Sequence, residues 1–464
     1  MLAPRRFPQI YLPLIGIAIA ALWPVTAYAL NPLLLPALIV VGVAVLVGVR
    51  WPEYALAIAI ALAPMARATL SQPPSVGVTL PANPLKYLVP ILILSVLFYS
   101  MLIRGLDRRP LPAVAIGVAL MVGSVLLSGF QALDPGRAVS FLLIIGAALF
   151  VAVVNTVRTR KQLLVVLAGV LAGLLISSLQ GVIQHQIGDF TFQFATSSPG
   201  APVGRVQAAF GQPDDYGGFL AILIPVALAV TFAGSLPRWL RVLAVASAAA
   251  AIPALVFSYS RWSMVACVVG SLLWLLLVRP KVALIGAVAL AVIALVFAPA
   301  NLRDRFQSTS GGTLAIRQDV NKGALDIYAA HPILGVGVNN FQIAYAEQWA
   351  GQSATQRRLF HTGQLLVPTA APNEFLNTLT EQGLVGLLAL LVFIVLAIRT
   401  AWGASRAAHP AVRAIGVAVG MAVGATLVNS YSSISLQDVP VDMLFVLLAL
   451  AAIGPGVFSD PKAA

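Results

Sequence analysis

Two arginines lie where the surrounding sequence is almost wholly apolar, and they are the first candidates for chemistry. Arg205 comes shortly before an apolar run, and Arg261 lies in the short turn Phe257–Trp262 between two apolar runs. A guanidinium group that is flanked by apolar, membrane-spanning sequence must reach the membrane surface, pair with an acid or face a water-filled cavity. For Arg205 we keep two interpretations open, a structural one, for instance as the partner of Asp214, and an anion-binding one. For Arg261 we favour a functional role.

A long, mostly polar interruption runs from about Asn301 to Pro372, between two strongly apolar runs. It contains His331 and His361, two of the four histidines of the chain, together with a group of arginines and lysines. Polar loops carried by a rigid scaffold are common places for binding and catalysis. We therefore expect the function to depend on this loop.

Within the loop, residues 313–330 predict an amphipathic helix that lies along the membrane surface. Its apolar positions, among them Val320, Ala324 and Ile327, recur every three or four residues, and Arg317 falls at the edge of that face. The pair His331–Pro332 is expected to end the helix, because the residue before a proline disfavours helical geometry.

A glycine-containing turn should follow, with Gly335 and Gly337 free to adopt positive φ and Asn340 close behind them. Pro372 is then expected to open the next apolar helix. The free N–H groups at that helix start are a potential anion site.

The composition places the chain in the class of membrane proteins. It is 60% hydrophobic and only 9% charged, far from the values of water-soluble domains. A helix needs about 20 apolar residues to cross the hydrocarbon core, so we predict an all-α polytopic membrane protein with about 12–14 transmembrane helices. Residues 1–464 form a single membrane domain, with a long extracytoplasmic loop at 300–372 that contains short helices and a shorter loop at 185–214. The expected spans are 9–29, 32–48, 53–70, 87–103, 111–129, 137–157, 163–184, 215–234, 240–258, 262–278, 282–299, 381–398, 412–430 and 439–456.

The basic residues predict the orientation. Outside the long loop, most of them fall on connections that share one side of the membrane, which the positive-inside rule assigns to the cytoplasm. Both termini are then cytoplasmic and the long loop faces outward. The net charge of +13 is mostly topological and does not argue for nucleic acid. As for any membrane protein, membrane lipids are expected partners.

Several common kinds of site are not suggested by the sequence. We find no glycine-rich phosphate loop of nucleotide-binding spacing and no His/Asp/Glu cluster suited to a metal, so no cofactor and no metal are expected. The single cysteine, Cys267, lies in an apolar run and makes an internal disulfide impossible. The first six spans carry few polar residues, and we interpret them as scaffold. Asp214 and Asp215 open an apolar run, where carboxylates favour the positive end of a helix.

Four blocks, in this order, resemble the O-antigen ligase and polysaccharide polymerase superfamily of bacterial inner-membrane glycosyltransferases. Arg205–Leu220 resembles the family's Gly-Phe-Gly-Asn-Pro-Asn segment, and Tyr259–Arg261 resembles its Ser-Arg turn. Ile316–Phe341 is similar to its Arg…His-Pro-Leu-Leu-Gly-Val-Gly…Asn-Phe block. Asn373–Leu387 is similar to the signature at the end of the family's loop. The motifs cover roughly 200–390, and hydropathy alone covers the rest.

The resemblance implies transfer of a glycan from a polyprenyl-pyrophosphate donor to a lipid- or glycan-linked acceptor, without metal, at the outer face of the bacterial inner membrane. Arginine presents a planar fork of donors that fits phosphate oxygens. On this basis Arg205, Arg261 and Arg317 are expected to surround the pyrophosphate. The loop positions Gly335, Gly337, Asn340 and Asn373 are expected to support the site.

The sequence departs from the ligase pattern at the expected base. The ligase branch usually has a histidine directly before the asparagine that ends the loop, and this chain has Pro372 before Asn373. His361 and Glu374 are the two candidates for a replacement, and His331 is less attractive because a His-Pro junction usually has a local structural role. The departure favours a polymerase or an atypical transferase over a typical ligase.

Two other functions compete with a transferase. One is a transporter of a small anion such as bicarbonate, which would place charges or broken helices near the bilayer midplane, often in a repeated architecture. The other is a non-catalytic scaffold for envelope assembly. The cations at the outer boundary and the lack of a visible repeat favour the transferase.

Overall fold

The computed structural model describes residues 34–67, 85–100, 111–136, 141–188, 204–210, 212–287, 311–350, 368–434 and 439–459. Within these ranges every regular element is helical and there is no strand. The elements are α2 (Leu34–Arg50), α3 (Pro52–Leu62), η1 (Met65–Arg67), α4 (Leu85–Phe98), α5 (Val114–Ser128), η3 (Gly129–Gln131), α6 (Phe141–Thr156), α7 (Arg160–Ile187), α8 (Pro213–Thr231), α9 (Arg238–Ser258), α10 (Arg261–Val278), α13 (Gly311–Ala330), α14 (Phe341–Ala350), α16 (Glu374–Ser405), α17 (Pro410–Asn429) and α18 (Val439–Ser459).

Eight helices of the described chain are long and apolar enough to cross a membrane, and three further apolar helices are shorter. The prediction of an all-α polytopic membrane protein is therefore confirmed. The predicted span 9–29 lies outside the described residues, and the span at 282–299 is described only as far as residue 287. The predicted span 381–398 falls within α16, which begins at Glu374 and is interrupted by non-helical backbone at Gly383, so its apolar part begins close to the predicted position.

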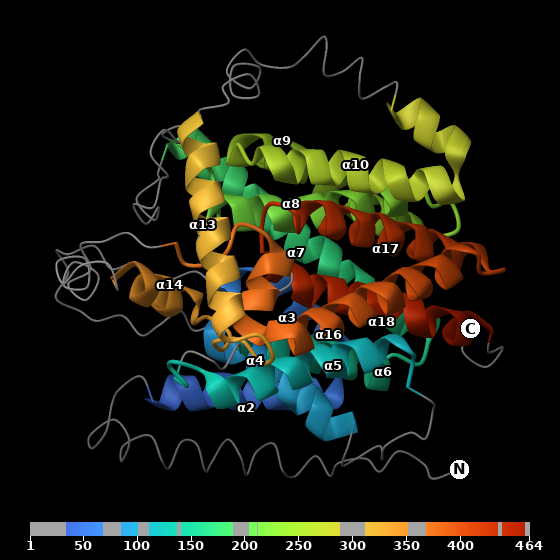
Figure 1. Ribbon diagram of the computed structural model, residues 1–464. Helices are drawn as coiled ribbons and strands as arrows, with labels where there is room; N and C mark the ends of the chain where they lie inside the picture. Colours follow the sequence, from blue (N-terminus) through green and yellow to red (C-terminus); the bar gives the residue numbers. More distant parts are fainter. Residues whose placement is uncertain are drawn as a thin grey trace.

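Small residues bring the helices of the bundle into close contact. Gly270 of α10 lies against Gly424 and Ala425 of α17, and Gly416 of α17 lies against Ala404 of α16. A Cβ atom at Gly416 would lie 2.2 Å from the backbone of Ala404, so a larger residue would push the helices apart. In a membrane such close approach lets van der Waals contacts hold helices together where burial from water contributes little. α10 and α17 accordingly run side by side (Figure 1).

One end of the bundle, which we call the site end, is where α8, α10 and α16 begin and where α9 and α17 finish. α13 lies across this end, roughly at right angles to the long helices (Figure 1). Its side chains Val320, Ala324 and Ile327 are buried, as the periodicity predicted, and they form a small separate core with Phe341 and Tyr345. The apolar face of α13 is thus covered by protein.

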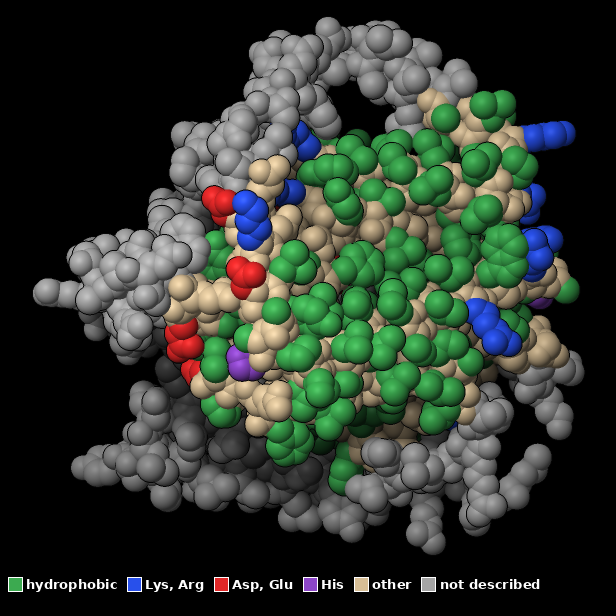
Figure 2. All heavy atoms as spheres, viewed as in Figure 1, with side chains coloured by type: hydrophobic (Ala, Val, Ile, Leu, Met, Phe, Trp, Pro, Cys, Tyr) green, Lys and Arg blue, Asp and Glu red, His purple; other side chains and the backbone are tan. Residues whose placement is uncertain are grey.

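Charged side chains gather at the two ends of the molecule, and apolar side chains cover the surface between them (Figure 2). Lysine and arginine side chains lie at the end opposite α13 with few acidic neighbours, whereas both basic and acidic side chains lie at the α13 end in this view. The described basic residues at or next to helix ends away from the site end include Arg50, Arg158, Arg160, Lys161, Arg238, Arg241, Arg279, Lys281, Arg406 and Arg413.

Candidate functional site

Arg205 caps the end of α9. Its Nε donates to the Ser258 carbonyl at 3.0 Å, and the neighbouring Val206 N–H donates to the Phe257 carbonyl at 3.0 Å. The last carbonyls of a helix have no partner within it and carry its negative end, so a guanidinium group is well suited to this position. Arg205 also pairs with Asp214, with Nη2 2.6 Å from Oδ1. The structure therefore shows the acidic partner that one of the two interpretations expected.

The Arg205–Asp214 pair lies at the surface of the site end. The Arg205 side chain is 13% exposed and the Asp214 side chain 52% exposed. Asp214 and Asp215 stand in the first turn of α8, as predicted. From α7, the Gln184 side-chain oxygen accepts the Gln207 and Ala208 N–H groups at 3.1 and 2.9 Å. These bonds fix the backbone directly after Arg205.

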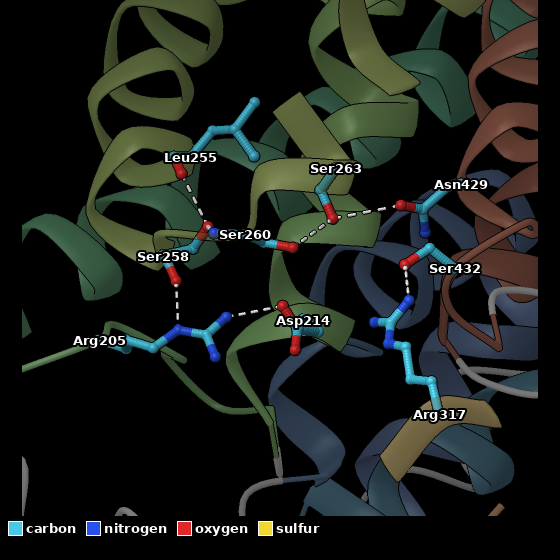
Figure 3. A network of polar contacts seen from close by, with 9 residues as sticks. All are labelled: Arg205, Asp214, Leu255, Ser258, Ser260, Ser263, Arg317, Asn429 and Ser432. Carbon is cyan, nitrogen blue, oxygen red and sulfur yellow. Dashed lines mark hydrogen bonds and ion pairs between the residues drawn. The ribbon is translucent and has the colours of Figure 1, made fainter. Parts of the chain in front are cut away.

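A chain of hydroxyl groups continues from the α9–α10 turn to α17 (Figure 3). The Ser260 and Ser263 hydroxyl oxygens lie 2.8 Å apart, and Ser263 donates to Asn429 Oδ1 at 3.2 Å. All three side chains are buried. Gly217 of α8 packs on the same two serines, where a Cβ atom would come within 2.7 Å of Ser260. This contact draws the start of α8 against the start of α10.

Arg261 is the first residue of α10, so it follows directly on the hydroxyl chain. Its side chain is half-buried. The turn that precedes Arg261 binds Arg205 through the Ser258 carbonyl. The same turn is linked to Asn429 of α17 through the Ser260 and Ser263 hydroxyl groups.

Arg317 reaches the same region from α13. Its Nη1 donates to the Ser432 hydroxyl at 3.1 Å, in the turn after α17. In the view of Figure 3 the guanidinium groups of Arg205 and Arg317 lie on either side of Asp214. The neighbouring Ser430 carbonyl accepts the Glu374 N–H at 2.9 Å. The turn after α17 therefore brings α13 and the start of α16 to one place.

The glycine-containing turn after α13 is held by a break in α16. Gly383 interrupts that helix with φ of 64°, and the break releases the Leu384 and Val385 N–H groups. These groups donate to the Pro332 and Ile333 carbonyls at 2.9 and 3.2 Å.

In the opposite direction, Val336 N donates to the Thr380 carbonyl at 3.1 Å and Gly337 N to the Glu381 carbonyl at 2.9 Å. Two of the motif blocks are thus joined through their backbones. Gly335 and Gly337 have φ of 68° and 91°, which confirms the expected positive φ. α13 ends at Ala330, directly before His331, also as predicted.

Asn340 fastens this turn to the segment that follows η3. Its Oδ1 accepts the Asp134 N–H at 2.7 Å, and its Nδ2 donates to the Val338 carbonyl at 3.0 Å. Gly337 allows the approach, because a Cβ atom there would meet Ala132 at 2.5 Å. The predicted supporting role of Asn340 and Gly337 therefore has a geometric basis.

Glu374 is almost fully buried, with 1% exposure. Glu374, Thr378 and Gln382 follow one another at four-residue intervals on one face of α16 and line a small cavity with Ser124 of α5. Ser124 donates to Gln382 Oε1 at 2.8 Å. Glu374 is therefore placed inside the protein, at this cavity.

Asn373 caps α16, since its side chain accepts the Leu376 N–H at 2.8 Å. Pro372 lies before this cap and not in the first turn, which corrects the prediction that the proline opens the helix. The other candidate base, His361, lies outside the described residues, as do Arg357 and Arg358.

Sequence reasoning did not single out several residues that build the site. Ser263, Asn429 and Ser432 connect α10, α17 and Arg317, and a buried carboxylate, Glu381, accepts the Phe341 N–H at 3.3 Å and an Asn377 side-chain N–H at 3.0 Å. Glu381 appeared only as part of a motif. Asn429 and Ser432 were only weakly indicated by the sequence, since polar residues at the end of an apolar span usually mark the start of a loop and not a functional site.

The arrangement combines cations, hydroxyl groups and helix starts at one end of a bundle. Guanidinium forks and the N–H groups of helix starts both suit an anion with several oxygens, such as a diphosphate. Among the described residues, no group of three or more His, Cys, Asp or Glu side chains is arranged to hold a metal.

Comparison with known families adds one finding. Residues 246–391 match the family model described as O-antigen ligase. The matched segment runs from within α9 to within α16, so it contains Arg261, Arg317 and the turn bound to the break in α16. Arg205 and Ser432 lie outside it. No curated protein matches the chain.

Proposed function

From the O-antigen ligase match over residues 246–391, which confirms the resemblance to that superfamily, we propose that the protein is a membrane glycosyltransferase that uses a lipid-linked donor. It transfers a glycan from a polyprenyl diphosphate to a lipid- or glycan-linked acceptor, as an O-antigen ligase or a polysaccharide polymerase does. The observation that carries the proposal is the gathering of Arg205, Arg261 and Arg317 around the ends of α9 and α17.

The arginines are proposed to bind the donor through its diphosphate. In the reaction the acceptor oxygen bonds to the anomeric carbon, while the bond from that carbon to the diphosphate breaks and the diphosphate keeps the electron pair. The leaving group thus gains charge in the transition state. Fixed cations in a partly dry site stabilise such charge most where it develops. Arg317 and Arg205 are held by hydrogen bonds to Ser432 and to Ser258, so little reorganisation is needed.

The acceptor hydroxyl must lose a proton, and His361 and Glu374 remain the proposed bases. A base must come within hydrogen-bond reach of the proton that it takes. The burial of Glu374 weighs against it, because an acceptor would have to enter the small cavity that Glu374 lines. We therefore favour His361.

We place the site on the outer face of the bacterial inner membrane, with both termini in the cytoplasm. The basic side chains at the end of the bundle away from α13 support this orientation, since cytoplasmic connections carry the excess of Lys and Arg (Figure 2). Single cysteines introduced at Ser432 and at Arg406, in a variant with Cys267 replaced by Ala, would test it. A membrane-impermeant thiol reagent applied to intact cells should label only position 432.

The function itself is tested by glycan transfer with the purified protein. It would be supplied with a polyprenyl-diphosphate oligosaccharide pool from its host, in the presence of a chelator. Transfer by the wild type, lost in Arg261→Ala and Arg317→Ala variants that remain folded, supports the proposal. If the folded wild type transfers nothing to any acceptor, while vesicles that contain it accumulate bicarbonate, a transporter replaces the transferase.

A further inference from the structure

Two exposed aromatic side chains meet at the site end. Trp262 in the first turn of α10 and Tyr431 in the turn after α17 have ring centroids 5.7 Å apart and an interplanar angle of 59°. Trp262 is 40% exposed and Tyr431 is 69% exposed. The two inclined rings form a corner at the surface of the protein, with part of each ring exposed.

Each ring is next in sequence to a residue of the proposed diphosphate site. Trp262 follows Arg261, and Tyr431 precedes Ser432, which accepts the Arg317 hydrogen bond. The Cα atoms of Trp262 and Tyr431 therefore lie about 3.8 Å from those of Arg261 and Ser432, so both rings start at the edge of the proposed diphosphate site. The contact between α10 and α17, fixed by Ser263 and Asn429, brings the two rings together.

The chemistry of the donor indicates what this corner binds. In a polyprenyl-diphosphate glycan the lipid is attached to one phosphate and the first sugar to the other. A diphosphate held by the arginines therefore places a sugar ring directly beside them. The face of an aromatic ring is electron-rich and attracts the weakly positive C–H groups on the face of a pyranose. Trp and Tyr also combine a large apolar face with a polar edge that tolerates water.

We propose that Trp262 and Tyr431 form a stacking subsite for the first sugars of the donor glycan. This inference rests on the proposed function, because the donor chemistry defines the occupant. The alternative is that both rings only anchor the helix ends at the lipid headgroups, as Trp and Tyr do at membrane interfaces. An anchor would not distinguish a donor with a glycan from one without it.

The test measures the binding of two probes to the purified full-length protein. One is the host polyprenyl-diphosphate oligosaccharide, and the other is the same polyprenyl diphosphate without sugar. In Trp262→Ala and Tyr431→Ala we expect the affinity for the first probe to fall about tenfold, the size of one or two aromatic contacts. The affinity for the sugar-free probe should stay within about twofold, since the arginines are unchanged.

Matched variants separate this subsite from the effects of losing any aromatic ring. Trp262→Phe and Tyr431→Phe keep a ring and should restore most of the affinity for the glycan-bearing probe. Phe130→Ala, an 84% exposed ring after α5, and Trp239→Ala at the start of α9 should leave both affinities unchanged.

Two results would overturn the subsite. Equal losses for both probes in the alanine variants would show that the rings anchor the protein or its site in general. No loss for either probe would show that the rings do not touch the donor. Neither result affects the proposed function, which fails only if the wild type transfers no glycan.

Discussion

The guanidinium group of Arg317 donates to the hydroxyl of Ser432 at 3.1 Å, although the two residues are 115 positions apart in the sequence. Arg317 belongs to the helix that lies across the bundle, and Ser432 belongs to the turn after α17. The bond therefore joins the long loop to the membrane helices at the place where Arg205 and Arg261 also lie.

Arg317→Lys is predicted to behave more like Arg317→Ala than like the wild type. Lysine keeps the charge but has no planar fork, so two-point binding of a diphosphate is lost. We expect kcat/KM for glycan transfer to fall by about 10²–10³ in both variants, the usual cost of one transition-state donor. Ser432→Ala should reduce it by less than about tenfold, because it removes only a support of the guanidinium group. Wild-type kinetics in Arg317→Lys would show that charge alone is needed.

Asp214→Asn is predicted to leave stability almost unchanged and to improve donor binding. In the Arg205–Asp214 pair the Asp214 side chain is about half-exposed to solvent. Such surface ion pairs contribute about 0–1 kcal/mol to the stability of the fold. In the donor complex the carboxylate competes with the diphosphate for Arg205, so its removal should lower the KM for the donor by a few-fold. Thermal unfolding and initial rates would be measured together. A raised KM with normal stability would mean that Asp214 assists the donor.

Gly383→Ala is predicted to destabilise the protein by about 2 kcal/mol or more, since a positive φ and a steric clash coincide there. A Cβ atom at Gly383 would lie 2.3 Å from the backbone of Ile333, in the turn that bonds to the break. Gly403→Ala, near the end of the same helix, is the control, because a Cβ there meets nothing within 4 Å. Thermal unfolding in detergent should separate the two. Equal transition temperatures would contradict the assigned break.

Glu381→Gln is predicted to lower stability by about 1–3 kcal/mol, the range for a buried donor left without a partner. The two carboxylate oxygens accept from the Phe341 N–H and from Asn377 Nδ2, and glutamine has only one acceptor oxygen. Asn377 cannot simply turn its amide around, because its Oδ1 accepts the Ala371 N–H at 3.0 Å. Denaturant or thermal unfolding of both proteins would check this. An unchanged midpoint would show that the carboxylate is not needed as a double acceptor.

His361→Ala and Glu374→Gln are predicted to differ in kind. If His361 takes the proton, its removal should lower kcat by about 10²–10⁴ with little effect on donor KM or stability. Glu374→Gln changes a buried group and should act on stability first. The reverse pattern, with kcat lost only in Glu374→Gln, would assign the base to Glu374.

The sequence was sufficient to predict the class of protein and the presence of helix α13, and the reasons are physical. Long apolar runs can only be membrane or core helices, and the period of three to four residues at Val320, Ala324 and Ile327 marks one face wherever that face packs. The sequence did not show what this face of α13 packs against. We expected it to meet the membrane surface, but Phe341 and Tyr345 cover it.

The junctions of the site had weaker signals or none. The turn at 332–337 pairs with the break at Gly383 through backbone groups, which every residue carries, so no side-chain pattern announces the pairing. The bond from Arg317 to Ser432 depends on how α13 crosses the bundle, and that orientation is a tertiary property. The motif blocks contact one another in the structure, but the motifs did not show which groups touch.

The most direct test of the central idea, that these arginines grip a diphosphate, is a binding measurement without catalysis. Purified wild type, Arg205→Ala, Arg317→Ala and the double variant would be compared for affinity toward polyprenyl diphosphate and polyprenyl monophosphate. We predict that the wild type prefers the diphosphate and that each single variant loses about tenfold or more of that preference, as expected for a lost charge-assisted contact. If all four folded proteins bind both lipids equally, the arginines do not form the diphosphate site.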